Sequence, residues 1–371
     1  MTERASRTTA KQCMYIRGLK LDHFRNYDSL DLEFSSGTNL FYGDNAQGKT
    51  NILEAVYFCG TTRSHRTSRD SELIRFGAQE AHLRMEMKKA SIDYRIDMHL
   101  KEGRAKGIAI NGAAIRKAQE LIGLGHFIFF SPEDLGIIKN SPAQRRRFLD
   151  MELCQLDRIY VSSLGAYNRV LQQRNRLLKD LAFRPQDMET LDVWDEQLIR
   201  YGSTVISARD RFVRRLSEMI RPIHEKLSGG REEMIIAYEK NTSVDHFKEN
   251  VRRGRDKDLL LKSTGCGPHR DDLGFVVNGI DIRRYGSQGQ QRSAALSLKL
   301  AEIELVKEST EDIPVLLLDD VLSELDTTRQ HDLLESIGGI QTFITCTGLE
   351  EYRNSPVQID QIYHVNEGSV S

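Results

Sequence analysis

The chain has 371 residues, enough for one large domain or two smaller ones, and its hydrophobic content of 39% and charged content of 29% are typical of a soluble globular protein. The net charge of −1 does not exclude a nucleic-acid partner, because basic residues can gather on one surface, and no apolar run is long enough to span a bilayer. The five cysteines are scattered without a C-x-x-C pair, which argues against a zinc ribbon or a disulfide framework and favours reduced thiols in a cytoplasmic protein without a membrane partner.

The N-terminal third predicts a short tail followed by strands. Residues 1–13 are polar and basic, without the apolar core of a secretory signal, and we expect a flexible tail there. Apolar and alternating segments then predict strands over residues 14–21, 30–34, 38–42 and 83–100. The strand at 38–42 leads into a glycine-rich loop, and residues 51–58 continue as a helix. Asn111-Gly112 lies between two apolar segments and predicts a tight hairpin.

The sequence pattern changes after residue 135. Residues 136–224 are rich in Leu, Arg, Gln and Glu with apolar positions at helical spacing, and they predict a helical insertion. A mixed α/β domain, made of residues 14–135 and 225–371, would surround this insertion. The elements expected after the insertion are a strand near 233–238, a variable loop near 240–255 and a hairpin around Asn278-Gly279.

A phosphate-binding loop is the most specific single motif in the chain. It fits the pattern G-x-x-x-x-G-K-[ST] and consists of Gly43, Asp44, Asn45, Ala46, Gln47, Gly48, Lys49 and Thr50. The glycines allow backbone N–H groups to point at phosphate, and the helix that follows adds its positive N-terminus. We expect Lys49 to reach the β- and γ-phosphates of ATP and to take part in catalysis, and Thr50 to bind Mg²⁺. A chance glycine-rich turn is the alternative.

Paired carboxylates follow a buried strand near the other end of the chain. Residues 313–318 are apolar, which is typical of a parallel strand covered on both faces, and ligands bind at the carboxyl ends of such strands. We expect Asp319 to hold Mg²⁺ through water, and Asp320 to be the catalytic residue that orients or deprotonates the attacking water. In the alternative interpretation, both side chains cap the end of the strand.

A third motif lies ahead of that strand. Ser287, Gly289 and Gln290 precede a predicted amphipathic helix over residues 292–307, and Ser287 is a favourable N-cap. The functional interpretation places this helix N-terminus against the γ-phosphate of ATP bound to a second copy of the chain, so that the three residues complete its nucleotide site. Helix capping alone is the alternative. The order of the three motifs predicts an ATPase head that forms a homodimer with ATP.

Seven segments together resemble the RecF family of recombination mediators, which is related to the ATPase heads of SMC proteins and ABC transporters. They are residues 21–27, 43–50, 130–135, 146–150, 267–273, 287–292 and 317–326. The resemblance implies an α/β fold, an ABC/SMC-type P-loop ATPase head with an inserted helical lobe. Lobe I, the ATPase core, would be residues 14–135 and 225–371, and lobe II would be the insertion at 136–224.

The same resemblance implies a function. The family consists of DNA-binding ATPases of recombinational repair and replication, which act after DNA damage and in the SOS response. They dimerise with ATP on gapped DNA or single-strand/double-strand junctions, work with RecR and RecO, and indirectly help to load RecA. Similar ATPases often carry Glu at the position of Asp320, so the shorter Asp predicts slow, DNA-dependent turnover.

Two other functions remain as alternatives. One is a DNA-binding scaffold whose ATP site switches assembly with negligible hydrolysis. The other is an ABC transporter ATPase subunit, which is disfavoured because residues 127–135 contain no counterpart of the transporter Gln and Thr347 stands where transporters have a His. Glu133 or Asp134 would substitute for that Gln or would cap the next helix.

Several side chains have more than one interpretation. By resemblance to SMC heads, Arg25 would contact ATP, and the alternative is a solvated surface arginine. His269 and Arg270 would line the nucleotide site, and the alternative is that they support a turn. The arginines of the helical insertion contact DNA or form a solvated helix face; they are Arg145, Arg146, Arg147, Arg158, Arg169, Arg174, Arg176, Arg184, Arg200, Arg209, Arg211, Arg214, Arg215 and Arg221. No His/Cys cluster in the sequence suggests a transition metal.

Overall fold

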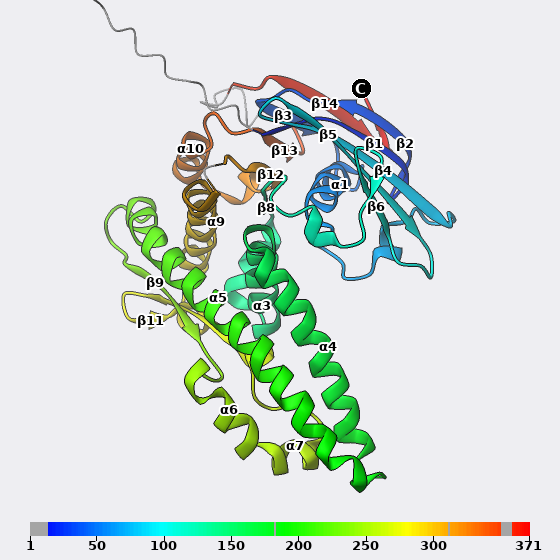
Figure 1. Ribbon diagram of the computed structural model, residues 1–371. Coiled ribbons are helices and arrows are strands. Elements are labelled where there is room, and N and C mark those ends of the chain that lie inside the picture. The colour runs from blue at the N-terminus through cyan, green and yellow to red at the C-terminus, as the bar shows by residue number, and fades with distance from the viewer. Residues whose placement is uncertain (1–13, 182, 311, 350–357) are drawn as a thin grey trace, which may run out of the picture. The chain divides into compact units, whose positions relative to one another are not determined.

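A computed structural model describes residues 14–181, 183–310, 312–349 and 358–371 (Figure 1). The expected flexible tail, residues 1–13, lies outside the described residues. Packing divides the chain into a first unit, made of the residues up to Ser131 and from Val306 onward, and a second unit that spans Pro132–Leu305. The second unit thus includes residues beyond the predicted insertion, and the assignment of an ATPase core and a helical lobe stays a prediction.

A mainly parallel sheet forms the base of the first unit. Its spatial order is β15 (Ser369–Val370), β14 (Gln361–Asn366), β3 (Thr38–Tyr42), β13 (Thr342–Cys346), β12 (Val315–Asp319) and β8 (Phe127–Phe130), with β15 antiparallel to the rest. Strands β12, β13 and β8 are buried along their whole length, as expected for parallel strands covered on both faces. In the register, Asp319 lies opposite Thr345 and Thr345 opposite Phe41, so the strands end together at one edge.

An antiparallel sheet completes the first unit. Its order is β2 (Tyr27–Glu33), β1 (Tyr15–Phe24), β4 (Glu80–Lys89), β5 (Ile92–Lys101), β6 (Gly107–Ile110) and β7 (Ala113–Ala114). Burial alternates along β4, which is the pattern of a strand with one face toward the core. The hairpin expected at Asn111-Gly112 is confirmed: both residues have positive φ, 51° and 83°, as a tight turn between β6 and β7 requires.

Two α-helices and three short 3-10 helices accompany these sheets in the described part of the first unit. The α-helices are α1 (Lys49–Thr61) and α10 (Thr327–Ser336), and the 3-10 helices are η1 (Asp70–Leu73), η2 (Ala118–Glu120) and η6 (Leu322–Glu324). Three more 3-10 helices lie in the second unit: η3 (Pro132–Asp134), η4 (Pro185–Glu189) and η5 (Pro268–Arg270). Helix α1 follows β3 directly, so the expected strand, loop and helix are present around the glycine-rich motif. That arrangement distinguishes a phosphate loop from a chance turn.

The second unit consists of helices and a small antiparallel sheet (Figure 1). The helices are α2 (Leu135–Lys139), α3 (Pro142–Leu156), α4 (Arg158–Asp180), α5 (Thr190–Leu227), α6 (Val244–Arg253), α7 (Arg255–Leu261), α8 (Ile282–Tyr285) and α9 (Gln288–Thr310), whose last turn extends past Leu305. The sheet has the order β11 (Ile280–Asp281), β10 (Asp272–Val277) and β9 (Met234–Glu239). Pro142 occupies the first turn of α3, where a missing N–H costs nothing.

The variable loop expected near residues 240–255 is wrong, because helix α6 occupies most of that segment. Ser243 caps the helix by accepting a hydrogen bond from the N–H of His246, at 3.4 Å. Phe247 and Val251, four residues apart, are buried on one face of the helix. The high density of charged residues hid both signals in the sequence.

The segment from Gly267 to Leu273 organises the core of the second unit. Asp271 is fully buried and accepts hydrogen bonds from the backbone N–H of Asn241, at 2.8 Å, and from the hydroxyl of Tyr238. The guanidinium of Arg209 lies 3.5 Å from Asp271 and donates to Asp150 at 2.7 Å. A buried charge requires such partners, so this network explains why an aspartate is required at this point of the fold.

His269 belongs to the same segment and supports the turn. Its Nε2 lies 3.0 Å from the carbonyl oxygen of Thr264, which can only accept, so Nε2 carries the proton. Nδ1 therefore accepts from the hydroxyl of Tyr167, at 2.6 Å. Burial lowers the pKa of His269 to about 4. The positive φ of Gly267 completes the turn, and a Cβ on that glycine would lie 2.4 Å from the Tyr167 hydroxyl oxygen.

The neutral state of His269 predicts that the second unit loses stability in mild acid. The unfolded chain binds a proton at this histidine below pH 6.5, whereas the folded chain does so only near pH 4. Between these values the unfolded state binds more protons, so the free energy of unfolding decreases as the pH is lowered from 6.5 to 4, by about 3 kcal/mol in total. Urea unfolding at pH 7.5 and pH 5, followed through the fluorescence of Trp194, the single tryptophan, measures this loss. His269→Gln should show a shallower pH dependence, and identical slopes for the two proteins would contradict the assignment.

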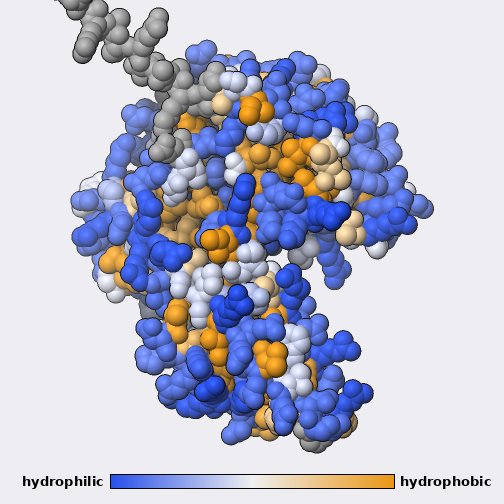
Figure 2. Space-filling model, in the orientation of Figure 1, coloured by the Kyte–Doolittle hydropathy of each residue, from blue (hydrophilic) through white to orange (hydrophobic). Residues whose placement is uncertain are grey.

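None of the helices in the described part of the chain has the length and the apolar character needed to cross a bilayer. Figure 2 shows that hydrophilic residues predominate on the visible face of both units.

Candidate nucleotide-binding site

The phosphate loop has the backbone conformation that its sequence predicts. Gly43 and Gly48 have φ values of 151° and 118°, which other residues rarely adopt. A Cβ at Gly43 would lie 2.2 Å from the carbonyl oxygen of Val365, and one at Gly48 would lie 2.5 Å from the amide nitrogen of Asn26. Helix α1 begins at Lys49, so its unpaired N–H groups face the loop.

Two turns from distant parts of the chain form hydrogen bonds with the phosphate loop. At the turn between β1 and β2, the Asn26 amide donates to the carbonyl oxygen of Gln47 at 3.0 Å, and the Tyr27 hydroxyl donates to that of Gly48 at 3.1 Å. At the turn between β14 and β15, the N–H of Glu367 donates to the Gln47 side chain at 2.6 Å. Sequence reasoning missed these partners, although Asn26 and Tyr27 lie in one of the segments that carry the family resemblance.

Lys49 lies inside the loop. Its ammonium donates to the carbonyl oxygens of Gly43, at 2.5 Å, and Asp44, at 2.7 Å, and the residue is 8% exposed. Burial lowers the pKa of Lys49, and the nearby carboxylates of Asp320 and Asp319 counteract this effect. A phosphate group bound beside the ammonium would also counteract the effect of burial on the pKa. Binding of an anion therefore favours the charged form of Lys49.

Thr50 and Asp319 come together as predicted. The Thr50 hydroxyl donates to Asp319 Oδ1 at 2.8 Å, and the Thr345 hydroxyl donates to the same oxygen at 2.8 Å. Burial raises the pKa of Asp319, and these two hydrogen bonds act in the opposite direction. A carboxylate and a hydroxyl are the hard oxygen ligands that Mg²⁺ accepts, and a cation would offset the burial of the Asp319 charge. The residues present therefore fit Mg²⁺.

Asp320 has a strained backbone. It follows the last residue of β12 and has a φ of 52°, a left-handed conformation that costs an ordinary residue about 1–3 kcal/mol. Its N–H donates to the Thr345 hydroxyl at 2.9 Å, and the Ser323 hydroxyl lies 2.9 Å from its carbonyl oxygen and 3.2 Å from its carboxylate. Nine other described residues that are not glycine also have a positive φ, so this conformation fits both the catalytic interpretation of Asp320 and a strand-end cap, and the catalytic role stays a prediction.

Arg25 forms an ion pair. Its guanidinium donates through two nitrogens to both carboxylate oxygens of Glu54, each at 2.8 Å, and through the third to the carbonyl oxygen of Glu72 at 2.9 Å. Glu54 lies on α1 and is fully buried. Arg25 is therefore not a freely solvated arginine, and its contact with ATP stays a prediction. The pair links the turn after β1 to the helix that carries the phosphate loop.

The third motif lies in the second unit and forms a capping box. The Ser287 hydroxyl accepts from the N–H of Gln290 at 3.2 Å, and the Gln290 side chain accepts from the N–H of Ser287 at 3.0 Å. The helix-cap alternative is thus realised at α9. Ser287 and Gly289 are also exposed, and a Cβ on Gly289 would meet only the Ser287 hydroxyl, at 3.9 Å. Both can be reached by a ligand, and nucleotide contact by Ser287, Gly289 and Gln290 stays a prediction.

Residues 127–135, the segment that has no counterpart of the transporter Gln, include Asp134, which forms an ion pair within the second unit. The Asp134 carboxylate lies 3.6 Å from the ammonium of Lys299 and makes no side-chain cap to α2. The alternative in which the Asp134 side chain caps the next helix is therefore not realised, and a role of Asp134 in place of the transporter Gln stays a prediction. Glu133 is exposed.

Comparison with known proteins identifies relatives over nearly the whole chain. The family model of the RecF/RecN/SMC N terminal domain matches residues 15–371. The DNA replication and repair protein RecF of Lachnoclostridium phytofermentans is 56% identical over 357 residues, which cover 96% of this chain and 99% of that protein. The protein of the same name from Agathobacter rectalis is 57% identical over 357 residues, with the same coverage of 96% and 99%.

Solved structures agree with these relatives. The recombination mediator protein RecF in complex with ATP, from the RecFOR pathway, has a TM-score of 0.91 and 36% identity over 98% of this chain and 99% of its own. The SMC head domain of Pyrococcus furiosus has a TM-score of 0.55 at 18% identity, covering 96% of this chain and 95% of its own, and shows the fold alone. The predicted α/β ATPase-head fold of the ABC/SMC type is confirmed, and the chain belongs to the RecF family.

Proposed function

We propose that this chain is an ATPase of recombinational DNA repair and replication, which binds Mg²⁺ and ATP and forms an ATP-dependent homodimer on DNA. The observation that carries the proposal is the contact between the Thr50 hydroxyl and the Asp319 carboxylate, 2.8 Å apart and next to Lys49 in the phosphate loop. Two segments of the chain, 269 residues apart, thereby supply one phosphate and metal site. The RecF structure with ATP supports the choice of nucleotide.

The residues of the loop bind and orient the triphosphate. Backbone N–H groups from Gly43 to Thr50 and the N-terminus of α1 surround the phosphates, and Lys49 exchanges its loop carbonyls for β- and γ-phosphate oxygens. Thr50 and Asp319 would hold Mg²⁺, which neutralises charge that develops on the phosphates when it is bound.

Asp320 is the residue that we assign to the attacking water. Its positive φ ends the extended conformation of β12, and Ser323 donates to one of its oxygens. The carboxylate accepts a hydrogen bond from water and orients it for in-line attack on the γ-phosphate. An Asp side chain is one methylene shorter than Glu, so turnover is slow.

DNA contact is assigned to an exposed basic face of α5. The arginines that recur there at helical spacing are Arg200, Arg211, Arg214, Arg215 and Arg221. Three arginines of the predicted set are buried instead: Arg145 pairs with Asp272, Arg174 with Asp195 and Asp258, and Arg209 with Asp150 and Asp271.

Those buried three are excluded from DNA contact. On the exposed face, Arg214 pairs with Asp210 and Arg221 with Glu233, so these arginines would exchange their carboxylate partners for phosphate oxygens on binding DNA. Family membership extends the proposal to gapped DNA and strand junctions as ligands, to RecR and RecO as partners, to RecA as an indirect partner, and to the cytoplasm as the location. A transporter subunit is not favoured by the comparisons, nor is a scaffold without hydrolysis.

Turnover and DNA affinity test this function together. ATP hydrolysis should rise when gapped DNA is added, and a complete lack of hydrolysis with and without DNA would make the chain a scaffold. The double variant Arg211→Glu with Arg215→Glu should bind gapped DNA at least about tenfold more weakly, with a salt slope smaller by about 2, because two phosphate contacts are lost.

Arg104→Glu, which changes an exposed arginine outside α5, is the matched control and should bind DNA like the parent protein. Fluorescence anisotropy with ATP at two salt concentrations measures both quantities. Parental DNA affinity in the double variant would remove α5 from the proposed interface.

A further inference from the structure

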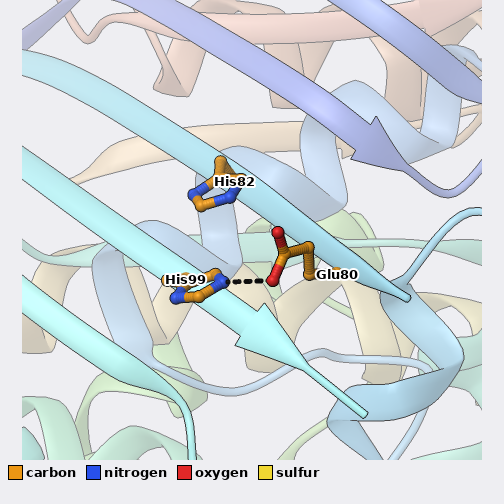
Figure 3. Close-up of side chains that lie close together, drawn as sticks. All are labelled: Glu80, His82 and His99. Atoms are coloured by element: carbon orange, nitrogen blue, oxygen red, sulfur yellow. Dashed lines mark hydrogen bonds and ion pairs between the residues drawn. The ribbon is translucent and has the colours of Figure 1, made fainter. Parts of the chain in front are cut away.

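The paired strands β4 and β5 bring two histidines and a glutamate together on the exposed face of the antiparallel sheet (Figure 3). His82 lies directly opposite His99 in the register, and Glu80 precedes His82 by two residues, so the three side chains point to the same face. Burial alternates along β4, with Ala81 and Leu83 in the core and His82 exposed. The cluster is thus an outward feature that the core does not require.

The geometry of the three side chains suits a common ligand. The imidazole rings of His82 and His99 stack with centroids 4.3 Å apart and planes inclined by 7°, and His99 Nε2 lies 3.2 Å from Glu80 Oε2. One donor atom from each of the three residues lies within 4.8 Å of the others. Two ligands on a tetrahedral ion are about 3.3 Å apart at the usual bond lengths, and rotation of exposed side chains can close that difference.

We propose that Glu80, His82 and His99 bind a divalent transition metal ion of the Zn²⁺ class. Two imidazoles and a carboxylate are the donors that such ions prefer, whereas Mg²⁺ and Ca²⁺ prefer oxygen ligands alone. Three protein ligands leave a fourth position for water.

The surroundings can accommodate that fourth ligand. His82 and His99 line a surface hollow of about 380 Å³, together with Lys20, Asp22 and Asp97. The site differs from the proposed Mg²⁺ site at Thr50 and Asp319 in residues and in donor chemistry. An ion bound here would join β4 to β5 and would stabilise the first unit by mass action.

Sequence analysis missed this site, because His99 lies 17 positions after His82 and only the strand register brings the two together. Lys101 is the one competitor that the structure records at these ligands: its ammonium donates to Glu80 Oε2 at 2.9 Å. A metal ion has to displace this lysine or use the other carboxylate oxygen. That competition gives the proposal a specific test.

Titration of the metal-free full-length chain with Co²⁺, a spectroscopic substitute for Zn²⁺, tests the site. We expect one tightly bound Co²⁺ per chain, with the visible absorption of a four-coordinate site, displaced by Zn²⁺ but not by excess Mg²⁺. His82→Ala and His99→Ala should each weaken binding at least about tenfold. Lys101→Ala should bind about two- to fivefold more tightly, because the competing cation is gone.

His331→Ala is the matched control, since His331 lies beside Asp332 and Glu335 in an exposed group of potential ligands on α10. It should bind Co²⁺ like the parent chain, and ATP binding by each variant shows that it is folded. Co²⁺ affinity that is unchanged in both His82→Ala and His99→Ala would overturn the proposal. So would weaker binding by Lys101→Ala, or the absence of a four-coordinate spectrum in the parent chain.

Discussion

Replacement of Lys49 by alanine is expected to abolish ATP hydrolysis and to weaken ATP binding by about 10- to 100-fold. The ammonium lies within the loop on the carbonyl oxygens of Gly43 and Asp44, and in the proposed complex it bonds phosphate oxygens instead. A charged hydrogen bond of this kind contributes about 1.5–3 kcal/mol, which corresponds to that change in affinity. Binding of a fluorescent ATP analogue and release of phosphate measure the two effects.

Asp319→Asn provides the comparison for Lys49→Ala. The amide oxygen can still accept a hydrogen bond from Thr50, but the negative charge that would hold Mg²⁺ is lost. Turnover should therefore fall by at least about 100-fold, because several kcal/mol of charge stabilisation disappear, while nucleotide binding changes much less. Parental turnover in both variants would refute the assignment of this site.

The second large effect is expected from Ser287→Arg. This variant should bind ATP as a monomer but should not dimerise with ATP, because a bulky cation replaces the small side chain proposed to face the γ-phosphate of the partner copy. Hydrolysis should fall to background, since Asp320 would then act in a site open to water. Sedimentation with and without ATP measures the dimer.

Loss of the helix cap alone could not explain that result if Ser287→Asp behaves in the same way. The Ser287 hydroxyl caps α9, and its loss costs about 1 kcal/mol. Aspartate is an equally good N-cap but would place a carboxylate against the γ-phosphate. Ser287→Asp should therefore keep the parental melting temperature and still fail to dimerise, whereas a normal ATP-driven dimer of Ser287→Asp would reduce the motif to a helix cap.

Mixing two inactive variants tests whether the site is shared between copies. A heterodimer of Ser287→Arg and Lys49→Ala chains contains one intact combination, with Lys49 from the first chain and Ser287 from the second. Partial hydrolysis should appear in the mixture although neither variant is active alone. A mixture without activity would place Lys49 and Ser287 in independent roles.

Local sequence signals predicted the elements that carry the chemistry. The strand before the loop, helix α1, the apolar strand β12 and the tight turns at Asn111-Gly112 and Asn278-Gly279 all follow from short-range rules of burial and backbone conformation. Such features depend on residues within one turn or one strand. The contact between Thr50 and Asp319 was also predictable, because carboxyl ends of neighbouring parallel strands meet at one edge.

The features that escaped prediction depend on partners far apart in the chain. Three contacts depend on the strand register and on the packing of α1. They are the ion pair of Arg25 with Glu54, the hydrogen bonds that the flanking turns make to Gln47, and the pairing of His82 with His99. No pattern of spacing within a single segment encodes these contacts. Helix α6 is different, since its cap and its apolar spacing were present in the sequence but were outweighed by its charge.

The position of β3 has a consequence for how the protein is made. This strand, which delivers the chain into the phosphate loop, lies between β13 and β14, and both are synthesised about 300 residues later. At about 5–20 residues per second, a ribosome needs about 15–60 s to cover that interval. During that time β3 has neither of its neighbouring strands, and the phosphate loop lacks the hydrogen bond that the Glu367 N–H donates to the Gln47 side chain. Nucleotide therefore cannot assist the early stages of folding, and a chain stalled before β14 would present an exposed strand edge to chaperones and proteases.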